Sequence, residues 1–198
     1  MIPDHESNDG RKRCEWVPVS DPLYLKYHDE EWGVPVHSDS KIFEMIVLEG
    51  QQAGLSWKTI LHKRENFRKA YANFDPVAIS QFDKEDIKRL LNDSGIIRNR
   101  SKIYAAIQNS ISFLKVQEEF GTFDSYIWGF VKNKTVHNSW KSEKDMPTRT
   151  EISDAMSNDL VKRGFKYVGS TICYSHMQAT GMVNDHVLEC YRYLELTR

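Results

Sequence analysis

The amino-acid sequence predicts an all-α fold, and three observations lead to this prediction. Helical periodicity of apolar residues dominates the 198-residue chain after residue 38. No segment shows the alternation of apolar and polar residues that marks a strand, and the chain has no internal repeat or low-complexity tract. Hydrophobic residues make up 40% of the sequence, a globular value, so a chain of this length can fill one core.

The first three predicted helices follow one another between short breaks. Asp39 is the expected N-cap of the first helix, which ends near Gly54. The second helix starts at Ser56 and stops at an Asp-Pro pair, and the third has a capped start at Asp83. An Asp-Ser-Gly turn ends the third helix.

The later helices are separated by one long polar segment. The clearest pattern lies between Asn99 and Glu119, where isoleucines and a leucine recur at spacings of three and four. Residues 132–150 are polar and contain a proline, which predicts a loop. The predicted helices span residues 39–54, 56–74, 83–92, 99–119, 123–130, 152–163, 170–181 and 185–192.

Charge and composition limit the partners and the compartment. The 27 Lys and Arg residues nearly balance 28 Asp and Glu residues, so attraction to a polyanion requires a local basic patch. No apolar run approaches the roughly 18 residues of a membrane span, and the start of the chain does not resemble a signal peptide. Residues 1–12 are expected to be a flexible polar leader. Three cysteines without a secretory signal are typical of a reducing cytosol.

Four residues from the two ends of the chain are candidate metal ligands. His186 and Cys190 are four apart on a predicted helix and therefore share a face. Cys14 and His28, in an irregular aromatic-rich stretch, could complete a tetrahedral zinc site with no position left for water, which indicates a structural metal. The alternative is that these cysteines are core residues, as we expect for Cys173, and spacing alone leaves both interpretations open.

Glu49 is the most informative single residue. Its spacing to the apolar residues of the first predicted helix places a carboxylate on the apolar face. Burying an unpaired carboxylate is costly, so such a group is usually paired or functional. A structural ion pair or a backbone cap explains the position equally well.

Aromatic residues surround this carboxylate in the sequence. Trp16, Tyr24, Tyr27, Trp32 and Trp57 offer flat faces, which beside a carboxylate would suit a planar cationic heterocycle, although aromatic residues more often fill cores.

The segment just after Glu49 contains a small residue and an apolar one in a predicted turn. Gly54 permits a close approach of the backbone, and Leu55 could act as an exposed apolar wedge.

The turn after the third predicted helix is a candidate phosphate site. Backbone amides at the start of a helix bind phosphate, and guanidinium groups strengthen such binding. An ordinary helical hairpin with a solvated basic turn is the alternative. The candidate residues of this turn are Ser94, Gly95, Ile96, Arg98 and Arg100.

Motifs of several other enzyme classes are missing from the sequence. There is no HExxH of zinc proteases, no GxxxxGK[ST] nucleotide loop and no GxSxG of serine hydrolases. Instead, the chain strongly resembles the 3-methyladenine-DNA glycosylase I family of bacterial base-excision repair from about Arg13 to Cys190. The resemblance is carried by DPLYLKYHDEEWGVP, FEMIVLEGQQAGLSWKTIL, LLNDSGIIRNRSKI and RGFKYVGSTICYSHMQATGMVNDH.

The resemblance implies a helix-hairpin-helix fold in a single glycosylase domain over residues 13–198. A zinc lobe would comprise about 13–38 and 165–198, and a helical hairpin lobe about 39–164. The implied activity is hydrolytic excision of 3-methyladenine from double-stranded alkylated DNA, without strand cleavage. The implied enzyme is a monomer of the bacterial cytoplasm that needs neither a protein partner nor a membrane.

The same resemblance assigns roles to the candidate residues. It makes Glu49 the catalytic, base-contacting carboxylate and places Gly54 and Leu55 in the gap left by the flipped base, with the turn residues on the DNA backbone. It implies an aromatic pocket of Tyr27, Trp57, Trp16 and Tyr24, and a structural Zn²⁺ on Cys14, His28, His186 and Cys190.

The chain departs from the family pattern in three ways. The leader is additional, and the interval from Cys14 to His28 is about one residue longer than usual. The catalytic Asp of the broader superfamily has no clear counterpart, with Asp124 only a weak candidate, and the Lys of its lyase members has none. A non-catalytic DNA-binding module and a zinc hydrolase are the competing functional classes.

Overall fold

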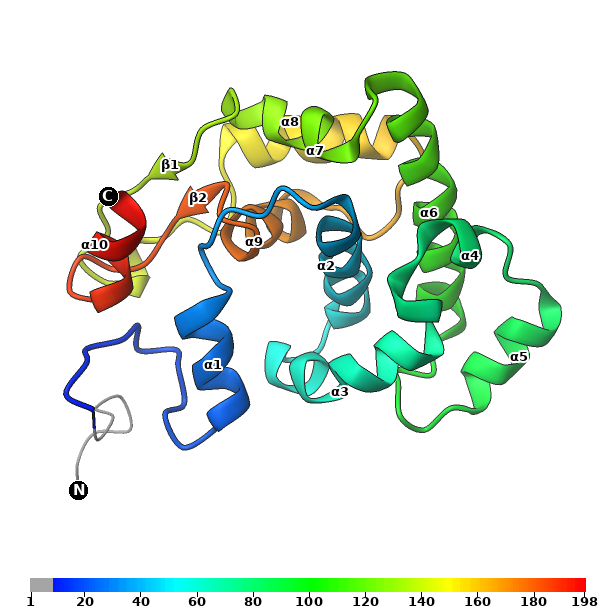
Figure 1. The fold of residues 1–198 in the computed structure, drawn as a ribbon, viewed down its shortest axis with the longest axis horizontal. Coiled ribbons are helices and arrows are strands. Elements are labelled where there is room, and N and C mark those ends of the chain that lie inside the picture. The colour runs from blue at the N-terminus through cyan, green and yellow to red at the C-terminus, as the bar shows by residue number, and fades with distance from the viewer. Residues whose placement is uncertain (1–8) are drawn as a thin grey trace.

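The computed structural model describes residues 9–198 and is mostly helical, as predicted (Figure 1). Residues 1–8 of the predicted leader lie outside the described part of the chain. The elements, in chain order, are α1 (Pro22–Glu30), α2 (Asp39–Gln52), α3 (Trp57–Ala70), η1 (Ala72–Phe74), α4 (Pro76–Ser80), α5 (Lys84–Asn92), α6 (Arg100–Phe120), α7 (Phe123–Ile127), η2 (Trp128–Val131), β1 (Val136–His137), η3 (Glu143–Asp145), α8 (Glu151–Lys162), α9 (Ser170–Ala179), β2 (Val183–Asn184) and α10 (Tyr191–Thr197).

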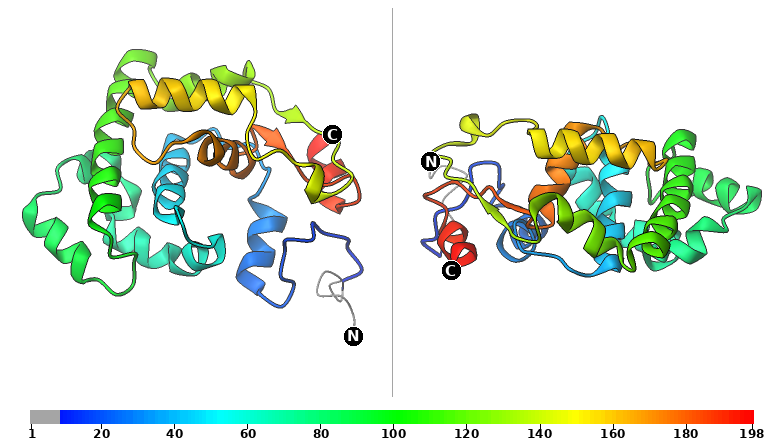
Figure 2. Two further views of the ribbon diagram at one scale, coloured as in Figure 1. Left: turned by 180° about the vertical axis from the view of Figure 1, so that it is seen from behind. Right: turned by 90° about the horizontal axis from the view of Figure 1, so that it is seen from above.

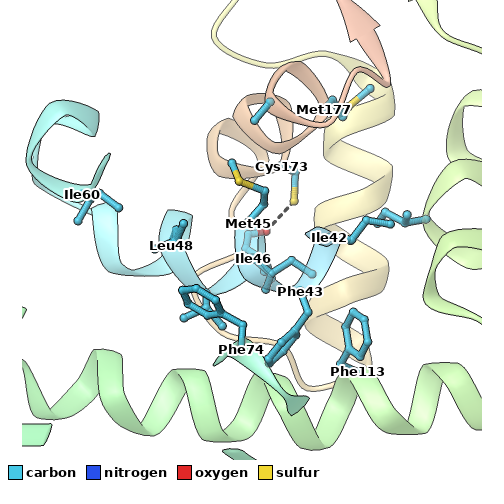
Figure 3. Packing of buried hydrophobic residues seen from close by; sticks show 14 of the residues in the cluster. Ile42, Phe43, Met45, Ile46, Leu48, Ile60, Phe74, Phe113, Cys173 and Met177 are labelled. Carbon is cyan, nitrogen blue, oxygen red and sulfur yellow. Dashed lines mark hydrogen bonds between the residues drawn. The ribbon is translucent and has the colours of Figure 1, made fainter. Parts of the chain in front are cut away.

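Helix α2 lies at the centre of the core, with α3, α6 and α9 around it (Figure 1). Every residue from Ile42 to Gln51 is buried, so this helix is covered on all sides. Figure 3 shows its apolar side chains against Phe113 of α6 and Cys173 of α9. Cys173 is a core residue, as predicted, and its thiol donates to the carbonyl of Val168.

The ends of the chain meet at one side of the molecule. The backbone amide of Tyr191, at the start of α10, donates to the carbonyl of Lys12. The described part of the predicted leader is therefore joined to the C-terminal helix. One continuous core also includes residues from both of the predicted lobes.

Local capping explains most of the helix starts. Ser56 accepts from the Thr59 amide, and Asp83 and Asp86 form a reciprocal capping box at the start of α5, as predicted. Asn99 accepts from the amide of Lys102 and caps α6.

The predicted cap at Asp39 is wrong. Ser38 is the N-cap residue of α2, and the Asp39 carboxylate instead accepts from the backbone amides of Phe123 and Asp124 and from the side-chain amide of Gln117. An acidic side chain at the start of one helix thus stabilises the start of another, α7, because it lies over the unpaired amides there.

Two helices were missed in the sequence analysis. The aromatic-rich stretch before residue 38 contains α1, which begins with an N-cap at Asp21 followed by Pro22, a typical start signal. The short helix α4 follows the Asp75-Pro76 pair, where the proline occupies the first helical position and does not end the structure.

The predicted helix over 185–192 is wrong. Residues 185–190 form a turn, and the last helix, α10, begins only at Tyr191. The buried carboxylate of Asp185 accepts from the side chains of Asn138, Trp140, Tyr174 and Gln178, and this network fixes the chain outside a helical path.

The prediction that the chain has no strand also needs correction. A parallel pair joins β1 and β2, with Val136 opposite Val183, but two residues per strand are too few to show an alternating pattern. No helix among residues 9–198 is both long and apolar enough to cross a membrane.

The carboxylate of Asp39 should stabilise the junction between α2 and α7. We expect Asp39→Ala to lower the free energy of unfolding by about 1–3 kcal/mol, because it leaves the amides of Phe123 and Asp124 without their acceptor. Urea unfolding followed by circular dichroism would measure this. Ser38→Ala is the matched control, because Ser38 makes no side-chain capping bond. Equal stability of the two variants would contradict the assignment.

Candidate active site and metal centre

One pocket brings together the predicted carboxylate and all of the predicted aromatic residues. It has a volume of about 270 Å³ and opens between α1, the end of α2, the start of α3 and α9. Its lining residues are Trp16, Tyr24, Tyr27, Trp32, Glu49, Gln52, Trp57, Glu143, Met146, Ser175, Gln178 and Ala179.

Glu49 is buried at the bottom of this pocket, with 4% of its surface exposed. Its Oε2 is 2.8 Å from Nδ1 of His176 on α9, and its Oε1 has no partner among residues 9–198. Burial raises the pKa of Glu49 above its usual range, although the charge and the hydrogen bond of His176 act in the opposite direction. Glu49 therefore lines the pocket with one of its two carboxylate oxygens unpaired.

The aromatic residues form a wall beside this carboxylate. The rings of Tyr27 and Trp57 have their centroids 5.3 Å apart, and Trp16 makes edge contacts with Tyr24 and Trp32 at 5.6 and 4.9 Å. Burial and then the charge of Glu49 raise the pKa of Tyr27, so its hydroxyl keeps its proton. A flat ligand entering the pocket would meet aromatic faces beside the Glu49 carboxylate.

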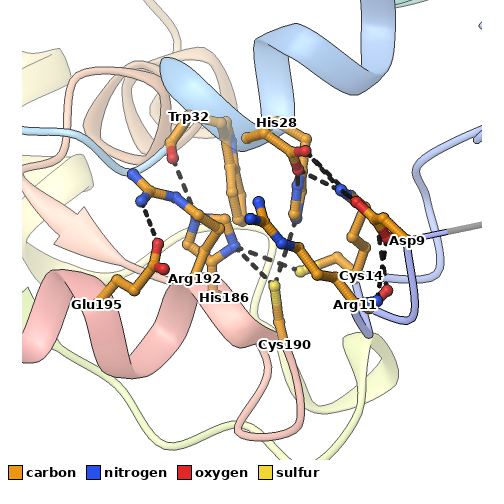
Figure 4. A network of polar contacts seen from close by, with 11 residues as sticks. Asp9, Arg11, Cys14, His28, Trp32, His186, Cys190, Arg192 and Glu195 are labelled. Carbon is orange, nitrogen blue, oxygen red and sulfur yellow. Dashed lines mark hydrogen bonds and ion pairs between the residues drawn. The ribbon is translucent and has the colours of Figure 1, made fainter. Parts of the chain in front are cut away.

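The four predicted metal ligands come together in a buried cluster. The ligand atoms of Cys14, His28, His186 and Cys190 all lie within 4.8 Å of one another (Figure 4). The Cys190 sulfur is 3.5 Å from Nε2 of His28 and 3.4 Å from Nδ1 of His186. The cluster could hold a metal ion. The prediction that His186 and Cys190 share one face of a helix is wrong. Both residues lie in a non-helical segment, and its turn brings them together.

In both histidines, the ring nitrogen that points away from the cluster makes a hydrogen bond, and this bond orients the nitrogen that faces the cluster. The other ring nitrogen of His28 donates to Asp29, whose carboxylate is itself held by Arg13, and that of His186 donates to the carbonyl of Trp32. Such contacts fix the tautomer of a ligating histidine. The neighbouring Cys14 thiol, and then the two imidazoles, lower the pKa of the Cys190 thiol against the effect of burial.

The Cys/His cluster lies directly against the aromatic wall. His28 follows Tyr27 on α1, and its ring lies 5.2 Å from that of Trp16. The ring of His186 lies 4.6 Å from that of Trp32. The cluster is fully buried, so it serves as a support behind the pocket.

The turn after α2 has the geometry expected of a wedge. Gly54 has a φ of +76°, which favours glycine, and the Leu55 side chain is 41% exposed. Lys102 of α6 donates to the carbonyls of Gln51 and Ala53 and so fixes the end of α2 just before the turn. Burial lowers the pKa of Lys102.

The predicted phosphate turn does join two helices, α5 and α6. The amide of Gly95 already donates to the carboxylate of Asp93, and Lys63 donates to the carbonyls of Ser94 and Gly95. Ile96 is buried, so it presents only its backbone, whereas the side chains of Arg98 and Arg100 are exposed.

The structure places one unpredicted residue, His176, at the site and one weak candidate, Asp124, away from it. His176, the partner of Glu49, was not singled out in the sequence analysis, because only the packing of α9 on α2 brings it there. Asp124, the weak candidate for a catalytic acid, lies on α7, pairs with His37 and does not line the pocket.

Comparisons with known proteins agree on one family. The family model described as methyladenine glycosylase matches residues 16–193. The chain is 51% identical to DNA-3-methyladenine glycosylase 1 of Escherichia coli (strain K12) over 182 residues, which cover 92% of this chain and 97% of the relative. It is 44% identical to DNA-3-methyladenine glycosylase of Haemophilus influenzae, with coverage of 90% and 96%.

Solved structures give the same result. A crystal structure of 3-methyladenine DNA glycosylase I superposes with a TM-score of 0.87 at 51% identity, covering 91% of this chain and 98% of that one. A variant of such an enzyme in complex with 3-methyladenine superposes with a TM-score of 0.84 at 33% identity, covering 86% and 92%.

We expect replacement of His176 to increase the free-energy cost of burying the ionised Glu49 carboxylate. A raised folded-state pKa means that stability falls as the pH rises above the ordinary value of 4.5, until the folded carboxyl also ionises. His176→Leu removes the group that counteracts this rise, so we expect a steeper fall and a loss of about 3 kcal/mol at pH 8.

Urea unfolding at pH 5 and pH 8 measures this effect. Adding Glu49→Gln to His176→Leu should abolish the extra pH dependence, because the carboxyl is then gone. Parallel stability curves for the wild type and His176→Leu between these pH values would show that the pair is not coupled.

Proposed function

The chain belongs to the methyladenine glycosylase family, and we propose that it hydrolyses the N-glycosyl bond of 3-methyladenine in double-stranded DNA, leaving an abasic site without strand cleavage. The observation that carries this proposal is the unpartnered Oε1 of Glu49, buried in a pocket with aromatic walls. An acceptor and π-faces suit a flat, cationic base that carries an amino group.

The proposed reaction begins with extraction of the nucleotide from the duplex. Flipping costs a few kcal/mol and is least costly for a damaged base. Alkylation at N3 makes the purine cationic, so it is already a good leaving group. The protein therefore needs to bind the cation in a dry site and needs little acid catalysis.

Glu49 and His176 have different roles at the bottom of the pocket. His176 donates to Oε2 and holds the carboxylate in place, while Oε1 faces no competing donor of residues 9–198. We assign Oε1 the amino group of the base. The positive charge of the bound base favours the ionised carboxylate, which in turn stabilises the cationic sugar that forms as the bond breaks.

The aromatic wall provides binding and selection. Tyr27 and Trp57 would stack on the base, with Trp16 and Tyr24 behind them. A neutral adenine lacks the charge that a carboxylate and π-faces attract, so the same pocket would bind it less strongly.

The proposed DNA contacts come from two turns that α6 holds together. Leu55 would enter the gap left by the flipped nucleotide, because it is apolar, exposed and follows a glycine in a left-handed conformation. The turn over 93–99 would bind the backbone in the helix-hairpin-helix manner, with Arg98 and Arg100 on phosphates.

We also propose that the Cys/His cluster holds one structural zinc ion. Zinc bonds of about 2.3 Å to sulfur and 2.0 Å to nitrogen place tetrahedral S and N ligands about 3.5 Å apart. The S···N distances of 3.4 to 3.6 Å in the cluster agree with this value. Four protein ligands leave no position for water, so the ion would stabilise the fold and the excision would depend on Glu49.

We further propose that the enzyme is a monomer of the bacterial cytoplasm. The three cysteines form no disulfide, which suits the reducing cytoplasm of a bacterium, and the pocket is lined by residues of a single chain. An assay for the release of free base from methylated DNA distinguishes a glycosylase from a non-catalytic DNA-binding module and from a zinc hydrolase. A DNA-binding module would bind without release, and a zinc hydrolase would lose activity as a labile metal is removed.

Glu49→Gln tests the proposed catalytic role. We expect it to fold normally but to lose at least about 100-fold in the single-turnover rate of 3-methyladenine release, because the neutral amide no longer stabilises a cation. Glu44→Gln on the same helix is the contrasting control. It breaks ion pairs with Arg64 and Arg68, so it should lower stability and leave excision unchanged below its melting temperature. Wild-type rates in Glu49→Gln would remove Glu49 from the mechanism.

Cys190→Ser tests the proposed zinc site. We expect it to lower the zinc content per chain and the melting temperature together, because the ion joins the two ends of the chain. Cys173→Ser, in the core and outside the cluster, should retain full zinc. Elemental analysis and thermal unfolding measure both quantities. A purified wild-type protein without zinc would contradict the assignment.

A further inference from the structure

A second cleft lies outside the aromatic pocket, between the start of α6 and the connection from α8 to α9. Arg100, Ser101 and Tyr104 line it from α6, and Lys166 and Tyr167 line it from the connection. Seen from behind in Figure 2, this connection passes beside α6 before it enters α9. Of these residues, only Arg100 was singled out in the sequence analysis.

The connection is fixed rigidly against α6. The side chain of the buried Asn109 accepts from the amide of Lys166 at 2.7 Å and donates to the carbonyl of the same residue at 3.0 Å. Gly164 has a φ of +94°, and a Cβ there would lie 3.1 Å from the Ser112 hydroxyl. The cleft is therefore preorganised, which lowers the entropy cost of binding.

Tyr167 occupies an unusual conformation at the inner end of the cleft. Its φ of +55° is strained for a tyrosine, and strain of this kind clusters at functional sites. Its hydroxyl donates to Ser101 at 3.0 Å. Its Cβ lies close to Gly50 of α2, because a Cβ added to that glycine would be 3.7 Å away from it. The residue also lines a small cavity behind Glu49 and His176. Tyr167 thus separates the cleft from the back of the active site.

The cleft carries positive charge that the protein itself does not neutralise. Arg100 and Lys166 line the cleft and are exposed, and no carboxylate of residues 9–198 forms an ion pair with either. No Asp or Glu lines the cleft. The ring of Tyr104 is 47% exposed between these charges. Basic groups beside an exposed aromatic ring are typical of nucleic-acid contacts.

The cleft continues the surface already proposed to contact DNA. Arg100 is the first residue of α6 and directly follows the turn over 93–99. Two residues later, Lys102 binds the end of α2 next to the turn of Gly54 and Leu55. The turn, the wedge and the cleft are therefore fixed to one helix end.

We propose that this cleft binds the sugar-phosphate backbone of the DNA next to the flipped nucleotide. Arg100 and Lys166 each pair with a phosphate, and Tyr104 packs against a deoxyribose. Tyr167 keeps the two walls at a fixed separation through Ser101. The proposal rests on the proposed function for the identity of the polyanion, and it adds Lys166, Tyr104 and Tyr167 to the binding surface.

The test is the salt dependence of binding by the full chain to a duplex with a stable abasic-site analogue. Each phosphate contact contributes about 0.9 to the slope of log Kd against log salt concentration. We expect Lys166→Ala to reduce the slope by about one and to weaken binding about tenfold at 0.1 M salt. Lys166→Arg should restore both. Tyr104→Ala should weaken binding several-fold without changing the slope, because it removes an uncharged contact.

The control is Lys134→Ala, an exposed lysine in the turn before β1, which should change neither quantity. Binding of free 3-methyladenine, followed by tryptophan fluorescence, should be the same in all variants, because the pocket is intact. An unchanged slope in Lys166→Ala would overturn the proposal, whatever its affinity. Failure of the wild type to release base, with the slope still reduced in Lys166→Ala, would refute the proposed function and leave the cleft as a DNA site.

Discussion

The hydrogen bond between Glu49 and His176 is the contact on which the site depends. Ionised carboxylates are rarely buried, because the loss of hydration is costly unless a partner compensates. Here His176 satisfies one oxygen, and the other is buried without a hydrogen-bond partner among residues 9–198. The pair also requires α9 to pack against α2, so the position of one side chain determines how two central helices are arranged.

The Cys/His cluster gives the opposite wall of the pocket its shape. It joins the first described residues to the last turn and lies against the rings of Trp16 and Trp32. Outer contacts from Asp29 and the Trp32 carbonyl fix which nitrogen each histidine presents. An ion bound there would act at a distance from the base, through the rigidity of the aromatic wall.

Helix α2 connects the pocket carboxylate with the proposed contacts to DNA. Glu49 lies about one turn before the end of this helix, and Leu55 is the third residue after that end. Lys102 fixes that end of α2 to α6, and Tyr167 fixes the α8–α9 connection to the same helix. The wedge, the turn and the basic cleft are therefore all held against α6, next to the pocket. A protein that reads one base within a duplex needs this fixed arrangement, because the flipped base and the strand must be held together.

The sequence by itself predicted most of the helices, because capping residues and apolar spacing act locally. It also singled out Glu49 and the four residues that form the buried Cys/His cluster. It did not determine the non-helical path around His186, where the buried Asp185 network overrides helical spacing, or the role of Asp39 as an acceptor for the backbone amides at the start of α7. Only the tertiary structure decided that His176 is the partner of Glu49 and that Lys166 lies beside Arg100. Residues far apart in the chain meet through packing, and no local pattern records such contacts.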